Sequence, residues 1–318
     1  MRPRELSRSI SMFAARTPTL PPATHTNSYA LGGRHVVLVE PATPYEGEQR
    51  AWIAWARGLT SQGRKALAIV ATHHHADHVG GIDVIARELG LPIWAHERTA
   101  SDPALKKTPV ARLLADGDVI ALDGPIPERW TVLHTPGHAW GHVCLWDEDS
   151  RTIVVGDMAT SVGTILIAPG DGDMRIYLEQ LARLAKLDAR LALPAHGGPI
   201  DEPTTLFHRY IEHRGLREKK ALRSLPASID EGQSLEDLVM IAYNDVPMTT
   251  WPIAKLSLAS HLAKLKDEEL AIERDGRWAA RALTPGPSPA RGEGRSETET
   301  PPLPLRERGT GGEGSRGG

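Results

Sequence analysis

The sequence predicts an α/β domain followed by a small helical module that ends in a hairpin, and two observations lead to this prediction. Between Tyr29 and Gly198, short β-branched runs alternate with helical patterns, as in α/β proteins. After residue 203 the pattern becomes helical and closes with two short β runs around Asp275-Gly276, a dipeptide favoured in two-residue hairpins. Helices followed by a hairpin indicate a winged-helix module.

The individual elements follow from where apolar residues recur with the period of a strand or of a helix. In the first domain, strands are expected at 35–39, 66–71, 92–95, 130–134, 143–146, 152–155 and 189–193, and helices at 47–62, 80–88 and 174–185. In the second module, helices are expected at 204–225, 235–243 and 252–267, and hairpin strands at 270–272 and 277–279. The last strand of the first domain ends at Pro194.

These patterns divide the chain into four segments. We expect an N-terminal extension at 1–17, the α/β domain at 18–203, the winged-helix module at 204–283 and a tail at 284–318. From about Thr284 the composition turns to Pro, Gly, Arg, Glu, Ser and Thr, and such a segment cannot offset its ordering entropy by burial. The tail is therefore predicted to be disordered.

Composition narrows the classes of function. With 37 Lys plus Arg against 40 Asp plus Glu in 318 residues, the formal net charge is −3, which gives no global reason to bind nucleic acid or an anionic membrane. The single cysteine, Cys144, excludes an intrachain disulfide and a thiolate-rich metal cluster. Because no apolar run approaches membrane-spanning length and the N-terminus lacks the features of a secretory signal, we expect no membrane partner and a cytoplasmic location.

The most informative segment lies directly after the apolar strand expected at 66–71. It contains four histidines and one aspartate within six residues, His73, His74, His75, Asp77 and His78. His73 and His75 lie two residues apart at an extended strand end, so their side chains can point the same way. Such a density of imidazoles at a strand end, before the Gly80-Gly81 turn, is hard to explain by packing and indicates metal binding.

Three later segments repeat the arrangement of a His or Asp beside glycine at a strand end. They supply His138 after Gly137, Asp157 after Gly156, and His196 before Gly197. In α/β proteins, sites are usually built where strands end in loops. The full candidate set of imidazoles and carboxylates suits zinc, manganese or iron, and comprises His73, His75, Asp77, His78, His138, Asp157 and His196.

With these residues the sequence resembles the metallo-β-lactamase superfamily, whose His-x-His-x-Asp-His signature is matched at 73–78. The resemblance covers roughly residues 20–198 and implies an αβ/βα four-layer sandwich that binds two divalent metal ions, with zinc as the expected metal. It implies that His73, His75 and His138 hold the first ion. It also implies that Asp77, His78 and His196 hold the second, with Asp157 bridging both.

One branch of the superfamily, which carries a C-terminal winged helix, is similar over a longer stretch. The similarity rests on Thr26-Asn27-Ser28-Tyr29, on Gly163-Thr164 and on the run from Tyr210 to Arg214, and it extends to about Ala280. This branch includes a mitochondrial single-stranded-RNA endonuclease of animals. Ala195 and the residues around Ala139-Trp140 depart from the usual pattern, which leaves the substrate open.

The ligand set predicts the mechanism. Three neutral imidazoles leave the charge of the first ion largely undiminished, so a bound water should ionise near neutral pH and attack the substrate directly as metal-bound hydroxide. Asp77 is the candidate catalytic residue, since it would orient the hydroxide and could carry a proton to the leaving group. No nucleophilic side chain is required.

Three functions remain open at this point. A phosphodiesterase acting on single-stranded RNA is suggested by the branch resemblance and by the basic segment 208–223, although acidic and basic residues balance over 204–284. The same site would also serve an ester, thioester (glyoxalase-like) or lactam hydrolase of small molecules. The third is a non-catalytic winged-helix nucleic-acid-binding protein with a structural metal site. The oligomeric state is open.

Other residues near these motifs have two readings. His142 either lies behind a ligand or is an ordinary strand residue, and His134 could line the cleft. His74, His96 and Cys144 are read as structural. Loops 97–109 and 160–172 are expected to shape the substrate pocket.

Overall fold

The computed structural model describes residues 3–105 and 107–281, so the tail predicted at 284–318 lies outside the described residues. The strands are β1 (Arg4–Glu5), β2 (Ile10–Arg16), β3 (His25–Leu31), β4 (His35–Val39), β5 (Lys65–Val70), β6 (Ile93–His96), β7 (Val110–Leu114), β8 (Val119–Leu122), β9 (Glu128–His134), β10 (Val143–Asp147), β11 (Thr152–Gly156), β12 (Leu191–Pro194), β13 (Ala271–Arg274) and β14 (Arg277–Ala280). The α-helices are α1 (Glu46–Ser61), α2 (Ala76–Val79), α3 (Ile82–Leu89), α4 (Glu97–Ala100), α5 (Met174–Ala185), α6 (Pro203–Ser224), α7 (Leu235–Ala242) and α8 (Trp251–Asp267). No helix among the described residues has the length and apolar character needed to cross a bilayer.

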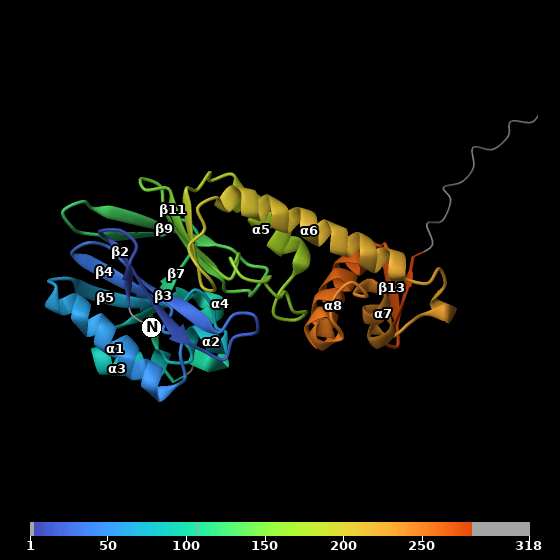
Figure 1. Ribbon diagram of the computed structural model, residues 1–318, viewed down its shortest axis with the longest axis horizontal. Helices are drawn as coiled ribbons and strands as arrows, with labels where there is room; N and C mark the ends of the chain where they lie inside the picture. The colour runs from blue at the N-terminus through green and yellow to red at the C-terminus, as the bar shows by residue number, and fades with distance from the viewer. Residues whose placement is uncertain (1–2, 106, 282–318) are drawn as a thin grey trace, which may run out of the picture. The chain divides into compact units, whose positions relative to one another are not determined.

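Two sheets form the centre of the first domain (Figure 1). The first sheet has seven strands in the order β1-β2-β3-β4-β5-β6-β7, antiparallel from β1 to β4 and parallel from β4 to β7. The second has five strands in the order β12-β11-β10-β9-β8, of which only the β11–β12 pair is parallel. Between residues 65 and 96 the strands alternate with helices, as the sequence predicted.

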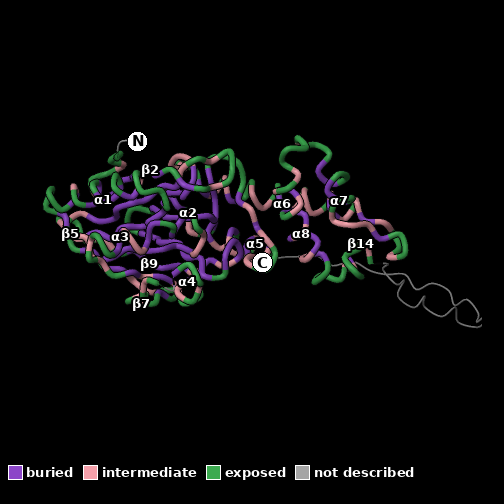
Figure 2. The backbone as a smooth tube through the Cα atoms, turned by 90° about the horizontal axis from the view of Figure 1, so that it is seen from below, coloured by how far each residue is buried: buried purple, intermediate pink, exposed green. Residues whose placement is uncertain are grey.

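The hydrophobic core is divided into layers, and most of the strands of both sheets are buried (Figure 2). One cluster, which includes Tyr29, Val70, Trp130 and Leu145, contains residues from both sheets and fills the space between them. A second cluster packs α1 and α3 on the first sheet, and a third packs α5 and Phe207 of α6 on the second. This is the predicted αβ/βα four-layer sandwich.

Residues 10–16, which we expected in an N-terminal extension, instead form β2, an internal strand of the first sheet between β1 and β3. Both of its faces are buried, with Met12 in the core between the sheets and Phe13 packed against Trp55 of α1. The expected extension is therefore wrong for these residues. The strand has no alternation of apolar and polar residues to reveal it, because apolar residues are needed on both faces.

The sequence also missed β3, β7 and β8. Strand β3 carries the buried polar residues Thr26, Asn27 and Ser28, which hide its apolar period. The helix expected at 80–88 is α3, which begins at Ile82, and the Gly80-Gly81 pair separates it from the short helix α2, which the sequence also missed. A side chain at either glycine would collide with backbone oxygen atoms, at 2.4 Å from Ala76 O for Gly80 and 2.6 Å from Thr43 O for Gly81.

The C-terminal module, residues 203–281, is a winged helix preceded by the long helix α6. Its core packs α6, α7 and α8 around Leu238, Leu258 and Leu262, with Ala271 of the hairpin. The hairpin strands β13 and β14 pair antiparallel around Asp275-Gly276, both of which have positive φ, as the turn requires. In α8, Leu258, Leu262 and Leu265 pack in this core, whereas Ile253 lines a cavity.

Candidate metal centre

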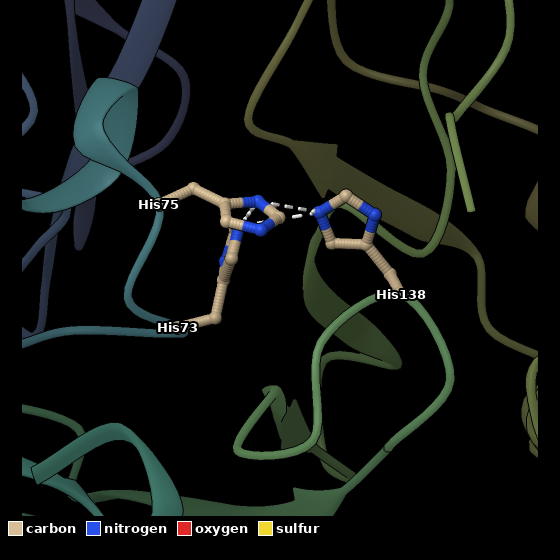
Figure 3. Close-up of side chains that lie close together, drawn as sticks. All are labelled: His73, His75 and His138. Atoms are coloured by element: carbon tan, nitrogen blue, oxygen red, sulfur yellow. Dashed lines mark hydrogen bonds between the residues drawn. The ribbon is translucent and has the colours of Figure 1, made fainter. Parts of the chain in front are cut away.

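The first group of candidate ligands consists of His73, His75 and His138 (Figure 3). His73 and His75 lie on the turn between β5 and α2, and His138 lies on the loop between β9 and β10 of the other sheet. The His75 Nδ1 atom is 3.0 Å from the Nε2 atoms of both His73 and His138, and those two Nε2 atoms are 3.3 Å apart. The structure thus brings together three imidazole nitrogens from segments 63 residues apart in sequence.

The second group consists of Asp77, His78 and His196. The His196 Nε2 atom lies 3.4 Å from one oxygen of Asp77, and the His78 Nε2 atom lies 3.8 Å from the other. Asp77 and His78 are on α2, and His196 follows β12. Strands β11 and β12 are parallel, so their carboxyl ends, which precede Asp157 and His196, lie at the same edge of the second sheet.

Asp157 lies between the two groups. Its Oδ2 atom is 3.4 Å from His138 Nε2 in the first group and 3.6 Å from His78 Nε2 in the second. Its Oδ1 atom is 3.4 Å from His196 Nε2. One carboxylate therefore contacts rings of both groups, which is the position that a bridging ligand requires.

Each candidate histidine has an inner nitrogen, which faces the other ligands, and an outer nitrogen, which faces away from them. The hydrogen bond of the outer nitrogen shows that the lone pair lies on the inner one. His138 Nδ1–H donates to the Leu166 carbonyl at 2.8 Å, and His196 Nδ1–H donates to the His25 carbonyl at 3.0 Å. The Asp171 carboxylate accepts from His75 Nε2–H at 2.5 Å. When the outer nitrogen of a neutral imidazole carries the proton, its inner nitrogen is an acceptor only.

The residues therefore fit a pair of divalent ions. The inner nitrogens of His73, His75 and His138 cannot satisfy one another as acceptors, whereas a cation among them would satisfy all three. In addition, His78 Nε2 and Asp157 Oδ1 are buried with no hydrogen-bond partner among the described residues. Buried polar atoms normally have partners, so these atoms point to a ligand that holds them.

The electrostatics separate the two groups. Burial lowers the pKa of His138 to about 4 and that of His73 well below its usual value, which favours the neutral rings that bind metal. Burial would also lower the pKa of His196, but Asp157 beside it outweighs this effect and raises that pKa to about 10. The carboxyl of Asp157 is disfavoured as an anion by burial, yet His78 and His196 hold its pKa well below the usual range.

Glu40 is a site residue that the sequence analysis missed. It follows β4 with a left-handed backbone (φ 63°) and is buried. The Thr72 hydroxyl donates to its Oε1 atom and accepts from His73 Nδ1–H at 3.0 Å, while its Oε2 atom lies 3.3 Å from His78 Nδ1. Glu40 is thus linked to the His73 ring through Thr72 and lies beside the His78 ring. Its position directly after the apolar run 35–39 was the available signal.

Asp171 was also missed, and it defines the role of His74. Its two oxygens face different rings, Oδ2 facing His75 and Oδ1 lying 3.3 Å from His74 Nε2. His74 also lies 3.7 Å from Asp102. The interpretation of His74 as structural agrees with these contacts. No sequence signal marked Asp171, because it lies in a loop without a strand before it.

His142 lies behind a candidate ligand, as the first of the two alternatives from the sequence proposed. Its Nε2 atom accepts from the Asp157 backbone N–H at 3.1 Å, and its Nδ1–H donates to the Thr135 hydroxyl at 2.8 Å. Burial lowers its pKa well below the usual value, which keeps the ring neutral as this arrangement requires. His142 therefore positions the backbone of the bridging residue.

His134, His96 and Cys144 do not line the cavity described below. His134 stacks on His96 with ring centroids 4.0 Å apart, so its proposed place in the cleft is wrong. His96 caps α4 by accepting from the Arg98 backbone N–H at 3.2 Å. Cys144 is fully buried, and burial raises the pKa of its thiol to about 12, as expected for a packed side chain.

A cavity of about 520 Å³ opens onto both groups of ligands. Its inner end is formed by His75, Asp77, His138, Asp157 and His196. Its walls come from loop 18–23, loop 160–168 and the C-terminal module, and are largely apolar, with Leu20, Pro21, Pro22, Val162, Ile165, Leu166, Val246, Pro247, Ile253 and Ala254. The second predicted loop, 160–172, contributes to the cavity, but no described residue of 97–109 does.

The arginines of α6 that reach this cavity are engaged by the protein itself. Arg214 is buried and donates to the Thr164 hydroxyl at 3.1 Å and to the Ile165 carbonyl. Arg217 pairs with Asp245 at 2.8 Å and lies over the Tyr243 ring. Of the two α6 arginines at the cavity, Arg217 is therefore neutralised by a carboxylate. Arg214 keeps its charge, and its donors bond to oxygens of the protein itself.

Comparisons with known proteins agree with this architecture. The family model described as "Metallo-beta-lactamase superfamily" matches residues 21–196, and the "Beta-lactamase associated winged helix domain" matches residues 234–278. A relative named "Beta-lactamase-like protein 2 homolog" from Drosophila melanogaster is 27% identical over 83% of this chain and 89% of its own length. A protein of the same name from Caenorhabditis elegans is 30% identical over 70% of this chain and 72% of its own.

Two solved structures share the fold. A metallo-beta-lactamase family protein from Thermus thermophilus aligns with a TM-score of 0.68 at 23% identity, over 85% of this chain and 98% of its own. A beta-lactamase domain protein from Burkholderia ambifaria aligns with a TM-score of 0.73 at 19% identity, over 87% of this chain and 93% of its own. The match to the superfamily model and the His/Asp groups together support a metal-dependent hydrolase. The chain belongs to the metallo-β-lactamase superfamily and carries the winged-helix domain associated with it.

Proposed function

We propose that this protein is a dinuclear zinc hydrolase that acts on small carbonyl substrates with an apolar body. The observation that carries the metal part of the proposal is the position of Asp157 between two groups of ligand atoms. Imidazole and carboxylate ligands suit zinc, although they accept other divalent metals. When bound, the ions would activate water and stabilise the negative charge that develops on the substrate.

The chain's own residues would handle the substrate and the proton. Asp77 lines the cavity, and its pKa is held below the usual range because His78 and His196 outweigh the effect of its burial. It is therefore ionised at neutral pH. In this position it would orient the attacking water and carry a proton to the leaving group.

The walls of the cavity support the choice of substrate. Apolar side chains from three segments line it, Arg217 is paired with a carboxylate, and the donors of Arg214 bond to protein oxygens. A carboxylic ester, thioester or lactam with an apolar body would bury its hydrocarbon against these walls and leave the carbonyl at the metal centre. A polyanion would instead need unpaired cations along the cavity.

Single-stranded RNA is the second candidate, favoured by exposed basic residues on α6 such as Arg209 and Lys219. Single-strand binding also uses stacking on aromatic side chains, and Tyr243 is the one Phe, Tyr or Trp residue that lines the cavity within the described residues. We therefore place RNA second. A cytoplasmic location accompanies either proposal.

The test combines metal analysis with a substrate panel on protein purified without chelator. We expect about two zinc ions per chain and hydrolysis of p-nitrophenyl esters or acyl thioesters, with kcat/KM rising with acyl chain length. Asp77→Asn should abolish turnover. Cleavage of a fluorescent single-stranded RNA with every carbonyl substrate untouched would favour the second candidate. Fewer than one metal per chain with no turnover would leave a non-catalytic binding protein.

A further inference from the structure

One irregular segment, residues 160–167, is held from one side by the C-terminal module. Arg214 of α6 donates to the Ile165 carbonyl, and the Ser260 hydroxyl of α8 donates to the Ile167 carbonyl at 2.5 Å. At the start of the segment, the Tyr210 hydroxyl donates to the Thr160 carbonyl at 3.0 Å. Three side chains of the module thus bind main-chain oxygens of this one segment.

On its other side, the same segment holds the metal centre. The Leu166 carbonyl, between the two residues that Arg214 and Ser260 bind, accepts from His138 Nδ1–H at 2.8 Å. The Thr160 hydroxyl donates to the His196 carbonyl at 3.0 Å. The segment therefore connects the module to one candidate ligand in each group.

We propose that the C-terminal module is a positioning element of the metal centre. Arg214 and Ser260 hold residues 165 and 167, and they thereby fix the Leu166 carbonyl that sets the orientation of the His138 ring. Neither residue belongs to a group of candidate ligands, and Ser260 does not line the cavity. The module thus strengthens metal binding itself, whichever substrate the enzyme hydrolyses.

The burial of these contacts explains why they matter. Arg214 and Ser260 are 3% and 4% exposed, so water cannot replace either donor without rearrangement. The segment has no helix or strand to hold its carbonyls. A ligand imidazole keeps its ring orientation through the partner of its outer nitrogen, and loss of such a partner typically weakens metal binding about 10–100-fold.

The decisive variant is Ser260→Ala in the full chain, with zinc affinity measured by competition against a chromophoric chelator. We expect the ion held by His138 to bind about ten-fold more weakly. This is the lower end of the range for loss of a supporting hydrogen bond. Ser260→Thr keeps the hydroxyl and should restore the affinity. Ser224→Ala is the matched control, since that hydroxyl bonds only to Ala221 within its own helix.

A double-mutant cycle tests the route through His138. In a His138→Gln background, Ser260→Ala should produce no further loss of zinc affinity, because the ring that it positions is gone. Arg214→Lys provides a second variant, with folding checked by near-ultraviolet circular dichroism. Cobalt-substituted Ser260→Ala should also show a shifted visible spectrum, which does not depend on turnover.

Two results would overturn the proposal. Unchanged zinc affinity and an unchanged cobalt spectrum in folded Ser260→Ala and Arg214→Lys would show that the module does not support the metal centre. An equal loss from Ser260→Ala in the presence and absence of the His138 ring would show that the effect does not pass through it. Both readouts are independent of hydrolysis, so failure of the proposed reaction would leave this test intact.

Discussion

The two sheets contribute to the metal centre in different ways. The first sheet supplies four candidate ligands from one turn of six residues after β5, His73 to His78. The second supplies His138, Asp157 and His196 from three separate loops. The compact turn is supported by Thr72 beside it and by Glu40 from the neighbouring strand of the same sheet, whereas His138 and His196 depend on carbonyls of other loops and strands.

The difference shows which ligands are sensitive to mutations distant from the metal centre. A contiguous motif is oriented by local backbone geometry, so distant changes should affect it little. Ligands on separate loops are only as well placed as the segments that bind them. We therefore expect mutations far from the metals to act mainly through the second sheet, and the predictions below test this comparison.

Removal of metal should have the largest effect, because it acts on both sides at once. Dialysis against a chelator should abolish hydrolysis and lower Tm, and zinc should restore both. Activity assays and thermal melts on the same samples provide the measurement. Full activity in metal-free protein would contradict the whole site.

Removing one candidate ligand contributed by either sheet should greatly reduce activity and zinc content, and to a similar extent for both sheets. His75→Ala and His138→Ala each remove a nitrogen from the first group, and both should reduce kcat/KM about 100-fold or more and lower the zinc content. His134→Ala is the control, because His134 stacks on His96 outside the cavity. Normal zinc content in either ligand variant would remove that residue from the site.

Asp171 supports the motif of the first sheet from a loop outside that sheet, and the loss of this support should have an intermediate effect. Asp171→Asn keeps the shape of the side chain but weakens the contact that holds His75 Nε2. We expect zinc affinity to fall about 10-fold, with retained secondary structure. Asp188→Asn, on an exposed carboxylate paired with Arg151, is a control that should leave zinc affinity unchanged. Equal affinities for the two variants would show that His75 needs no such support.

A backbone change on the second sheet should have a moderate effect. Gly137 has φ of 129°, and a Cβ there would lie 2.4 Å from the Tyr177 backbone. Gly137→Ala should therefore displace His138 and destabilise the fold by about 1–3 kcal/mol, measured by urea unfolding. Gly58→Ala, in α1 with open space around it, should instead stabilise by up to about 1 kcal/mol.

The smallest effect should come from the cysteine of the second sheet. Cys144 packs in the core behind the second sheet and bonds to no candidate ligand. Cys144→Ala should cost about 1 kcal/mol of stability through lost packing and leave zinc content unchanged, as elemental analysis would show. A drop in zinc content would mean that the thiol supports the site.

Much of the fold could be predicted from the sequence where local pattern and tertiary structure agree. Helices α1, α5, α6 and α8 and most parallel strands lie close to their expected positions. Strands such as β4 and β11 were found because they are continuous runs rich in β-branched residues. Strand β2 was missed because it neither alternates nor forms a β-branched run, and β3 because polar side chains face inward. One of those, Asn27, donates to the carbonyls of Pro194 and Gly197 on either side of His196.

The sequence by itself determined the chemistry of the candidate site, because ligand type and spacing after strand ends are local properties of the chain. All seven predicted residues converge in the structure. Only the tertiary structure decided which oxygens orient the rings, through Glu40, Asp171 and the Leu166 carbonyl, and that α6 and α8 brace the loop carrying the last of these. Such contacts join segments far apart in the chain, and a carbonyl oxygen has no side-chain signature in a sequence.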